Sequence, residues 1–199
     1  MKTKAIALVS MLLAAFALSF NVADFVEAMK LDVANSTIKW RGTKVTGEHY
    51  GKIQLKDGEL EMKKDKLVGG SFTVDMSTMT CDDLDAGEWN DKLIGHLKSD
   101  DFFGVEKYPT ATFVITKAKA KGNDMYDITG DMTIKGKTET VMFPATVKMD
   151  GDAVTATAKI TLDRTKYDIR YGSASFFDNL GDKAIGNDFF LEVELTAKK

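Results

Sequence analysis

The sequence predicts an all-β protein, in which an antiparallel sheet of eight strands closes on itself as a barrel. A short helix is expected between the third and fourth strands, and a long aromatic loop before the last strand. Polar and apolar residues alternate along most of the chain, which is typical of strands with one buried face. Short turns at Gly122-Asn123, Lys135-Gly136 and Asp150-Gly151 join neighbouring strands into hairpins. Consecutive hairpins of this kind favour a closed antiparallel sheet.

The alternation also sets the extent of each strand. Within the seventh, Val154, Ile160 and Leu162 share one face, and threonines occupy the other. In the second, the apolar parity shifts by one residue at Asp57-Gly58, which predicts a β-bulge. The expected strands are 37–45, 51–63, 66–76, 110–118, 124–134, 138–149, 152–163 and 188–198.

Two segments depart from the strand pattern. Residues 82–103 place Trp89, Leu93 and Leu97 on one face of a short helix. Residues 171–187 form a long connection, and loops of this length often carry function. Because the sequence has no repeat and no linker, we expect one domain over 29–199.

Residues 1–28 have the pattern of a secretory signal peptide, with two early lysines and an apolar run over 5–20. This run is shorter than the roughly 20 residues that a membrane span needs. We therefore expect cleavage after Ala28, or after Ala23, and a periplasmic or secreted mature chain.

The charge pattern excludes two classes of protein. A net charge of −3 gives no support for nucleic-acid binding. Charged residues such as Lys39, Asp127 and Glu192 occupy the polar strand faces, whereas an outer-membrane barrel turns an apolar face to lipid. The single cysteine, Cys81, cannot form an internal disulfide and is either a quiet buried thiol or a redox-active group. The expected product is a soluble barrel without a stable membrane span.

The sequence offers little for catalysis. His49 and His96 are the only histidines, and they lie on different predicted elements. The sequence has no cysteine and histidine spacing typical of a metal site, no nucleophile motif and no phosphate-binding glycine loop. We therefore expect no catalytic residue, no metal and no enzymatic activity.

An eight-stranded barrel is either filled by its side chains or holds one small ligand. Small inward residues at Ala156 and Ala158 would leave space that larger apolar residues then surround. The residues alone leave both possibilities open. The candidate wall residues are Trp40, Phe72, Phe113, Ile128, Met132, Phe143, Ala156, Ala158, Ile160 and Phe189.

Two segments are the most distinctive part of the chain. The first runs from His96 to Phe113 and the second from Gly130 to Pro144. Together they resemble the two signature segments of the YceI-like family, and the likeness extends to Ser36–Trp40 and Ile160–Arg164. The chain departs from the family pattern at Asp100, where proline is usual.

The resemblance implies a lipocalin-like barrel that holds a polyisoprenoid or similar long-chain amphiphile for storage, transport or stress protection. It implies no cofactor chemistry, although an isoprenoid quinone could be the bound ligand. The implied partner is a hydrophobic lipid, and a homodimer is left open. The alternatives are a lipid-modifying enzyme that uses His49 or His96 as a base, and a structural barrel with a filled core.

Two aromatic pairs fall in irregular segments, Phe102-Phe103 and Phe176-Phe177. Exposed aromatic pairs leave apolar area in water, so we expect segments 97–103 and 171–180 to pack together over one barrel end as a gate for the ligand.

Two polar residues are candidates for the barrel mouth, His96 and Arg164. For His96 and Lys98, a charge interaction with the helix C-terminus is favoured over ligand contact. For Arg164, a surface ion pair with Asp163 or Asp168 is the favoured explanation.

Overall fold

The computed structural model describes residues 25–199, which form nine strands, one α-helix and four short 3₁₀ turns. The helix α1 spans Glu88–Lys98, inside the predicted segment. The strands are β1 (Glu27–Leu31), β2 (Thr37–Lys44), β3 (Gly47–Lys63), β4 (Lys66–Asp75), β5 (Thr110–Gly122), β6 (Met125–Ile134), β7 (Lys137–Asp150), β8 (Ala153–Asp163) and β9 (Ile185–Lys198). The turns are η1 (Val33–Asn35), η2 (Met76–Thr78), η3 (Arg164–Tyr167) and η4 (Gly181–Lys183).

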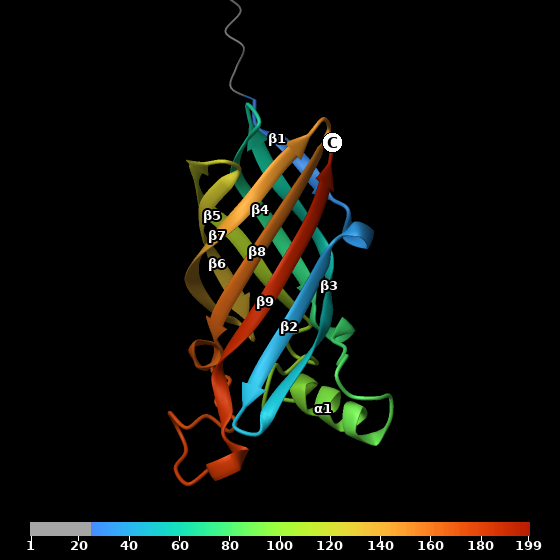
Figure 1. The fold of residues 1–199 in the computed structure, drawn as a ribbon, viewed down its shortest axis with the longest axis vertical. Helices are drawn as coiled ribbons and strands as arrows, with labels where there is room; N and C mark the ends of the chain where they lie inside the picture. Colours follow the sequence, from blue (N-terminus) through green and yellow to red (C-terminus); the bar gives the residue numbers. More distant parts are fainter. Residues whose placement is uncertain (1–24) are drawn as a thin grey trace, which may run out of the picture.

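The sheet closes into a barrel, as predicted (Figure 1). Its order runs from β3 through β2, β9, β8, β7, β6 and β5 to β4, and β4 pairs again with β3. Every pairing is antiparallel. These eight positions leave no free edge in the ring. The helix lies between β4 and β5, where the sequence placed it.

The strand β1 was not predicted. It pairs with the end of β3, setting Met29 opposite Leu60, and with the end of β9, setting Leu31 opposite Ala197. Because β2 also lies between β3 and β9, β1 and β2 occupy one barrel position on either side of a break at 32–36. The sequence prediction missed β1 because its five residues adjoin the apolar signal pattern.

The predicted signal peptide falls largely on residues 1–24, which lie outside the described residues. The predicted domain start at residue 29 falls within β1.

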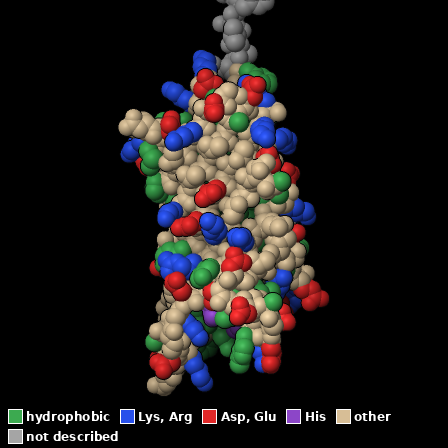
Figure 2. Space-filling view, turned by 45° about the vertical axis from the view of Figure 1, so that its right-hand side comes forward, with side chains coloured by type: hydrophobic (Ala, Val, Ile, Leu, Met, Phe, Trp, Pro, Cys, Tyr) green, Lys and Arg blue, Asp and Glu red, His purple; other side chains and the backbone are tan. Residues whose placement is uncertain are grey.

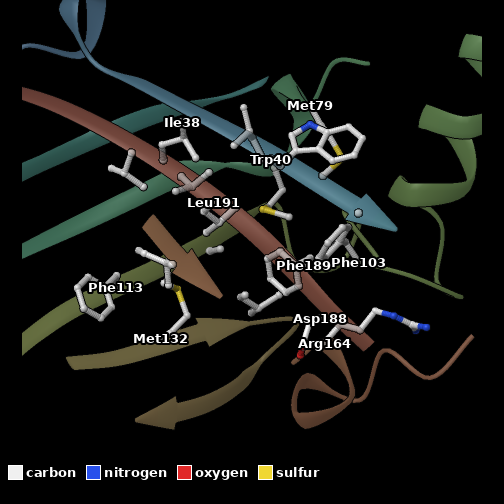
Figure 3. Close-up of a pocket in the computed structure, with 18 of the residues that line it drawn as sticks. Ile38, Trp40, Met79, Phe103, Phe113, Met132, Arg164, Asp188, Phe189 and Leu191 are labelled. Carbon is white, nitrogen blue, oxygen red and sulfur yellow. The ribbon is translucent and has the colours of Figure 1, made fainter. Parts of the chain in front are cut away.

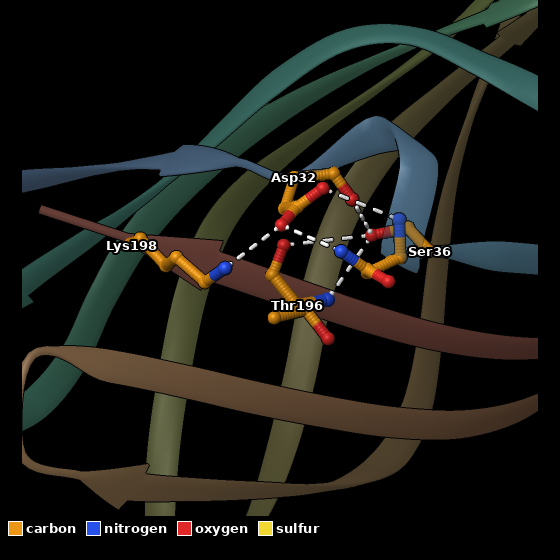
Figure 4. Close-up of polar contacts among 5 residues, drawn as sticks. Asp32, Ser36, Thr196 and Lys198 are labelled. Carbon is orange, nitrogen blue, oxygen red and sulfur yellow. Dashed lines mark hydrogen bonds and ion pairs between the residues drawn. The ribbon is translucent and has the colours of Figure 1, made fainter.

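Polar contacts bridge the break between β1 and β2 (Figure 4). The Asp32 N–H donates to the Thr196 carbonyl at 2.8 Å, and the Thr196 N–H donates to the Ser36 hydroxyl at 3.1 Å. The Asp32 carboxylate accepts from Asn35 and from Lys198, and these hydrogen bonds hold the pKa of Asp32 below its ordinary value. One main-chain bond and several side-chain bonds thus take the place of the ladder that a continuous strand would form.

The remaining differences concern strand ends. β3 begins at Gly47 rather than at 51, β5 extends to Gly122 rather than 118, and β9 begins at Ile185 rather than 188. The β3–β4 register shifts between Leu55 and Asp57, which confirms the predicted β-bulge. Within residues 25–199, no helix combines the length and the apolar character that a bilayer crossing requires.

The two ends of the barrel differ in structure (Figure 1). The upper end carries β1, the β3–β4 and β7–β8 hairpins and the C-terminus, whereas α1 and the connection from β8 to β9 lie at the lower end. The upper end is closed by apolar side chains that are at most 2% exposed. These are Met29, Leu60, Met62, Val154 and Ala197.

Candidate ligand-binding cavity

A cavity of about 540 Å³ occupies the barrel interior and reaches the lower end, beside α1. This volume lies within the usual range of small-molecule sites, roughly 300–1,000 Å³. Figure 2 shows the recess at that end, where hydrophobic and histidine side chains gather. Its wall is almost entirely apolar, and its charged groups lie at the mouth. Residues from each strand of β2 to β9 contribute, among them Ile38, Ile53, Leu55, Leu67, Val74, Ile115, Ile134, Val147, Leu191 and Val193.

The structure places most of the predicted ligand-binding residues on this wall. Alternation along each strand directs every second side chain inward, which is why the sequence pattern located them. The polar candidates His96 and Arg164 lie at the mouth (Figure 3 shows Arg164). The predicted residues on the wall are Trp40, Phe72, Phe102, Phe103, Phe113, Ile128, Met132, Phe143, Ala156, Ala158, Ile160 and Phe189.

Small residues on adjacent strands keep the lumen open. Ala145 on β7 lies directly opposite Ala158 on β8, and both line the cavity. The ring of Phe113 stacks on Phe72 at 6.4 Å and contacts Phe143 at 5.4 Å between centroids. The rings of Phe72 and Phe143 thus both pack on that of Phe113, while the short side chains of the two alanines leave lumen space unfilled.

Aromatic side chains surround the mouth (Figure 3). Phe103 meets Phe189 edge-to-face at 6.5 Å, and Phe102 meets Phe103 at 5.6 Å. The ring of Tyr171 lies 4.4 Å from that of His96 and 6.4 Å from that of Phe102. The segments 97–103 and 171–180 therefore do meet, through Tyr171.

The prediction that Phe176 and Phe177 cover the barrel end is wrong. Their residues are 46% and 51% exposed, and neither lies on the cavity wall. The Ser173 carbonyl accepts the backbone N–H of both, and the buried Ser173 hydroxyl donates to Asn187 at 2.7 Å. This tight turn directs the pair away from the mouth, and Phe176 packs under the guanidinium of Arg170 at 4.7 Å.

Arg164 is buried rather than paired at the surface, so the favoured sequence interpretation is wrong. It is 2% exposed, and its guanidinium donates to the carbonyl oxygens of Gly186, Ile169 and Ile185 at 2.8, 2.7 and 3.1 Å. The guanidinium carbon lies 5.4 Å from the centroid of the Phe102 ring. Burial holds the pKa of Arg164 below its ordinary value, although the nearby Asp163 opposes this shift.

The two aspartates predicted as partners of Arg164 have other roles. Asp163 accepts from the Thr165 N–H and hydroxyl at the start of η3. Asp168 forms an ion pair with Arg170 at 2.9 Å. Two of the three carbonyls that bind Arg164 come from the start of β9, more than 20 residues along the chain, so sequence spacing could not identify them.

His96 and Lys98 lie in the last turn of α1, as predicted. The Lys98 ammonium donates to the Ser77 carbonyl at 2.6 Å, which joins the helix to η2. Among the described residues, the His96 ring contacts Phe102 and Tyr171 and makes no hydrogen bond. His96 thus belongs to the cavity mouth as well as to the helix end.

Several cavity residues escaped the sequence prediction. Leu191 and Val193 on β9 could have been found from the same alternation. Met76, Met79 and Tyr171 lie outside strands, where alternation carries no information. His49, at the mouth end of β3, also lines the cavity, and its Nδ1 lies 2.7 Å from the Asp83 carboxylate.

Asp83 also accepts from the Cys81 thiol at 3.2 Å and from the Tyr50 N–H at 2.8 Å. Burial alone would raise the pKa of Asp83, but the hydrogen bonds from Tyr50, His49 and Cys81 outweigh it and hold that pKa below its ordinary value. Burial, together with the hydrogen bond to Asp83, raises the pKa of the Cys81 thiol. Cys81 is thus buried in this structure, with its thiol directed at Asp83.

A family model described as the YceI-like domain matches residues 29–197. The chain belongs to the YceI-like family. A UPF0312 protein of Pseudomonas putida is 35% identical over 104 residues, which are 51% of this chain and 50% of that protein. The protein YceI of Escherichia coli is 36% identical over 103 residues, 52% and 51% of the two chains. The chain thus spans about half the length of the curated relatives it matches.

Solved structures support the fold of this YceI-like chain. BcnA of Burkholderia cenocepacia superposes with a TM-score of 0.68 at 23% identity, over 84% of this chain and 99% of that one. A polyisoprenoid binding domain from Saccharophagus degradans superposes with a TM-score of 0.61 at 13% identity, over 87% and 99%. At these identities the likeness establishes the barrel architecture.

Proposed function

We propose that this YceI-like protein binds a polyisoprenoid or a similar long-chain amphiphile inside its barrel and stores or carries it. The observation that carries the proposal is the apolar cavity that runs from Leu60 and Leu67, near the closed end, to His96 and Arg164 at the mouth. Two findings support the same ligand class. The chain belongs to the YceI-like family, and a polyisoprenoid binding domain is among the structural neighbours of this chain.

Burial of the ligand tail is sufficient to drive binding. Ten buried methylene groups contribute roughly 8 kcal/mol at about 0.8 kcal/mol each. The loss of ligand freedom offsets part of this, but a long chain supplies more than ten such groups. Affinity in the micromolar range, about −8 kcal/mol, is therefore within reach of tail burial alone.

The mouth suits the polar end of an amphiphile. A guanidinium has about five N–H donors, and carbonyl groups of the protein take three of those of Arg164. The remaining donors of this buried cation can bind an oxygen acceptor such as a hydroxyl or a quinone carbonyl. We therefore place the tail toward the closed end and the polar group beside Arg164.

We also propose export to the periplasm, from the signal pattern in residues 1–28. The start of β1 favours cleavage after Ala23, because Glu27 pairs with Met62 and its carboxylate lies 3.3 Å from the Lys199 ammonium. Cleavage after Ala28 would remove both interactions. The intact mass of the exported form distinguishes a chain that begins at Asp24 from one that begins at Met29.

Native mass spectrometry of the protein purified from its own cells tests the ligand proposal. We expect one lipid per chain, with an isoprenoid mass pattern after extraction. An Ile160→Trp variant, which narrows the lumen, should carry less lipid than the unaltered chain. A folded protein that carries no lipid and takes up neither an isoprenoid quinone nor a fatty acid would overturn the proposal. Release of a chemically altered lipid, dependent on His49 or His96, would instead indicate an enzyme.

A further inference from the structure

Three side chains beside the barrel mouth bring together an imidazole, a thiol and a carboxylate. They are His49, Cys81 and Asp83, and one ligand atom from each lies within 4.8 Å of the other two. His49 comes from β3, and the other two come from the segment between η2 and α1. This arrangement is separate from the apolar lumen, although His49 also lines the cavity.

The backbone of residues 80–83 is fixed against β3. The Thr80 N–H donates to the Lys52 carbonyl at 2.9 Å, and the Asp82 N–H donates to the Tyr50 carbonyl at 2.8 Å. These bonds continue the line of β4 along β3 beyond the end of that strand. A Cβ atom at Gly51 would collide with the Thr80 carbonyl, so glycine is required for this close approach.

Side chains hold the same segment from its other side. The Trp40 indole N–H donates to the Thr80 carbonyl at 3.0 Å. The Asn90 amide on α1 donates to the carbonyls of Cys81 and Leu84 at 3.1 and 2.9 Å. The positions of the three ligand-bearing residues are therefore set by the barrel and the helix, and not by the cluster itself.

Within the cluster, the His49 ring and the Cys81 thiol both contact the Asp83 carboxylate. Asp83 is close to His49 Nδ1 at 2.7 Å and accepts from the Cys81 thiol at 3.2 Å. The Tyr50 N–H orients the carboxylate at 2.8 Å. Cys81 is buried, and the side chains of His49 and Asp83 are 29% and 15% exposed, so the cluster is sheltered and still reachable from solvent.

We propose that His49, Cys81 and Asp83 form a binding site for a divalent zinc-class cation. A nitrogen, a sulfur and an oxygen ligand form the mixed set that Zn²⁺ accepts, whereas Ca²⁺ and Mg²⁺ require oxygen ligands. A thiolate and a carboxylate together balance the charge of a divalent ion. Binding releases the thiol proton to solvent, and solvent supplies the fourth ligand.

The site would act on the mouth of the cavity. Because His49 and Trp40 both line the lumen and both contact the 80–83 segment, a bound ion would tie that segment to the barrel wall. The proposal does not depend on the identity of the lipid, since Cys81 and Asp83 do not line the cavity and His49 lines it only at the mouth.

Titration of the purified, metal-free chain with Zn²⁺ and with Co²⁺ tests the site. We expect one ion per chain and a thiolate-to-cobalt charge-transfer absorption. Cys81→Ser, His49→Gln and Asp83→Asn should each weaken Zn²⁺ binding at least tenfold, and Cys81→Ser should abolish the absorption band. Mg²⁺ should not compete.

Two matched variants serve as controls. His96→Gln removes the other histidine, and Asp82→Asn removes the adjacent carboxylate, and both should bind Zn²⁺ like the unaltered chain. The cobalt spectrum of the unaltered chain keeps the test valid where a variant fails to fold. Absence of a thiolate band, or Zn²⁺ affinity unchanged in folded Cys81→Ser, would overturn the proposal.

Discussion

The closed end and the mouth of the barrel use apolar residues in opposite ways. At the closed end, Met29 and Val154 are 0% exposed and pack in a continuous core. At the mouth, Phe103 and Phe189 line an open cavity. The same class of side chain therefore supplies stability at one end and a binding surface at the other.

The difference arises from what each end must do. Interior side chains gain dispersion and burial only where neighbouring atoms surround them. Side chains that face an empty cavity lack part of these contacts. They gain them only when a ligand fills the cavity, and that gain then contributes to binding. Changes at the closed end should therefore alter the free energy of unfolding, whereas changes in the lumen or at the mouth should alter binding.

The largest effect is expected at the closed end. Met29→Ala would leave a hole between β1 and the ends of β3 and β9, and should lower the free energy of unfolding by about 2–5 kcal/mol. Urea unfolding measures this change. The control is Met142→Ala, because that methionine is 74% exposed and its loss should have little effect. Equal effects from the two variants would contradict the assignment of the closed end as the main core.

A substitution in the lumen should weaken ligand binding and leave the free energy of unfolding nearly unchanged. Ala158→Phe directs a ring into the cavity and should weaken binding of a hydrophobic fluorophore at least tenfold, about 1.4 kcal/mol, with the fold retained. Overpacking a filled core would instead cost about 1–3 kcal/mol of stability. Thr155→Phe, on the exposed face of β8, is the matched control. Normal binding by Ala158→Phe would show that this position does not limit the lumen.

A smaller effect is expected at Tyr167, in η3 below the barrel. Its hydroxyl is buried and has no hydrogen-bond partner among the described residues, so Tyr167→Phe should stabilise the protein by about 1 kcal/mol. Burial raises the pKa of Tyr167 to about 12, above its unfolded value of about 10. The neutral form is therefore favoured in the folded state, and stability should fall as the pH rises from about 10 to 12.

The Tyr167→Phe variant should not show this fall in stability at alkaline pH. Urea unfolding at a series of pH values compares the two chains. A loss of stability at neutral pH would mean that the hydroxyl makes a favourable interaction.

The smallest effect concerns the mouth itself. Tyr171→Ala removes the ring contacts with His96 and Phe102, worth about 0.5–1.5 kcal/mol, and should speed ligand release a few-fold. The double variant Phe176→Ala, Phe177→Ala should release ligand at nearly the normal rate, because neither ring lies on the cavity wall. Stopped-flow displacement of a fluorescent lipid compares them. Faster release from the double variant alone would restore Phe176 and Phe177 as the gate.

The sequence by itself determined the barrel and most of its wall. Alternation with a period of two is a local property, so it identified eight strands, the β-bulge at Asp57-Gly58 and inward residues from Trp40 to Phe189. The helix followed from local spacing in the same way. These features need no knowledge of distant partners.

Only the tertiary structure decided the features that join distant segments. β1 is five residues long and becomes a strand because the ends of β3 and β9 offer it unpaired ladder groups. Arg164 is buried because three carbonyls from separate segments satisfy its guanidinium, and the turn at Ser173 directs Phe176 and Phe177 outward. The β1 pairings and the Arg164 bonds to Ile185 and Gly186 depend on chain closure over long sequence separations, which no local pattern encodes. The turn at Ser173 is local, but the hydrogen bond from its hydroxyl to Asn187 joins it to β9.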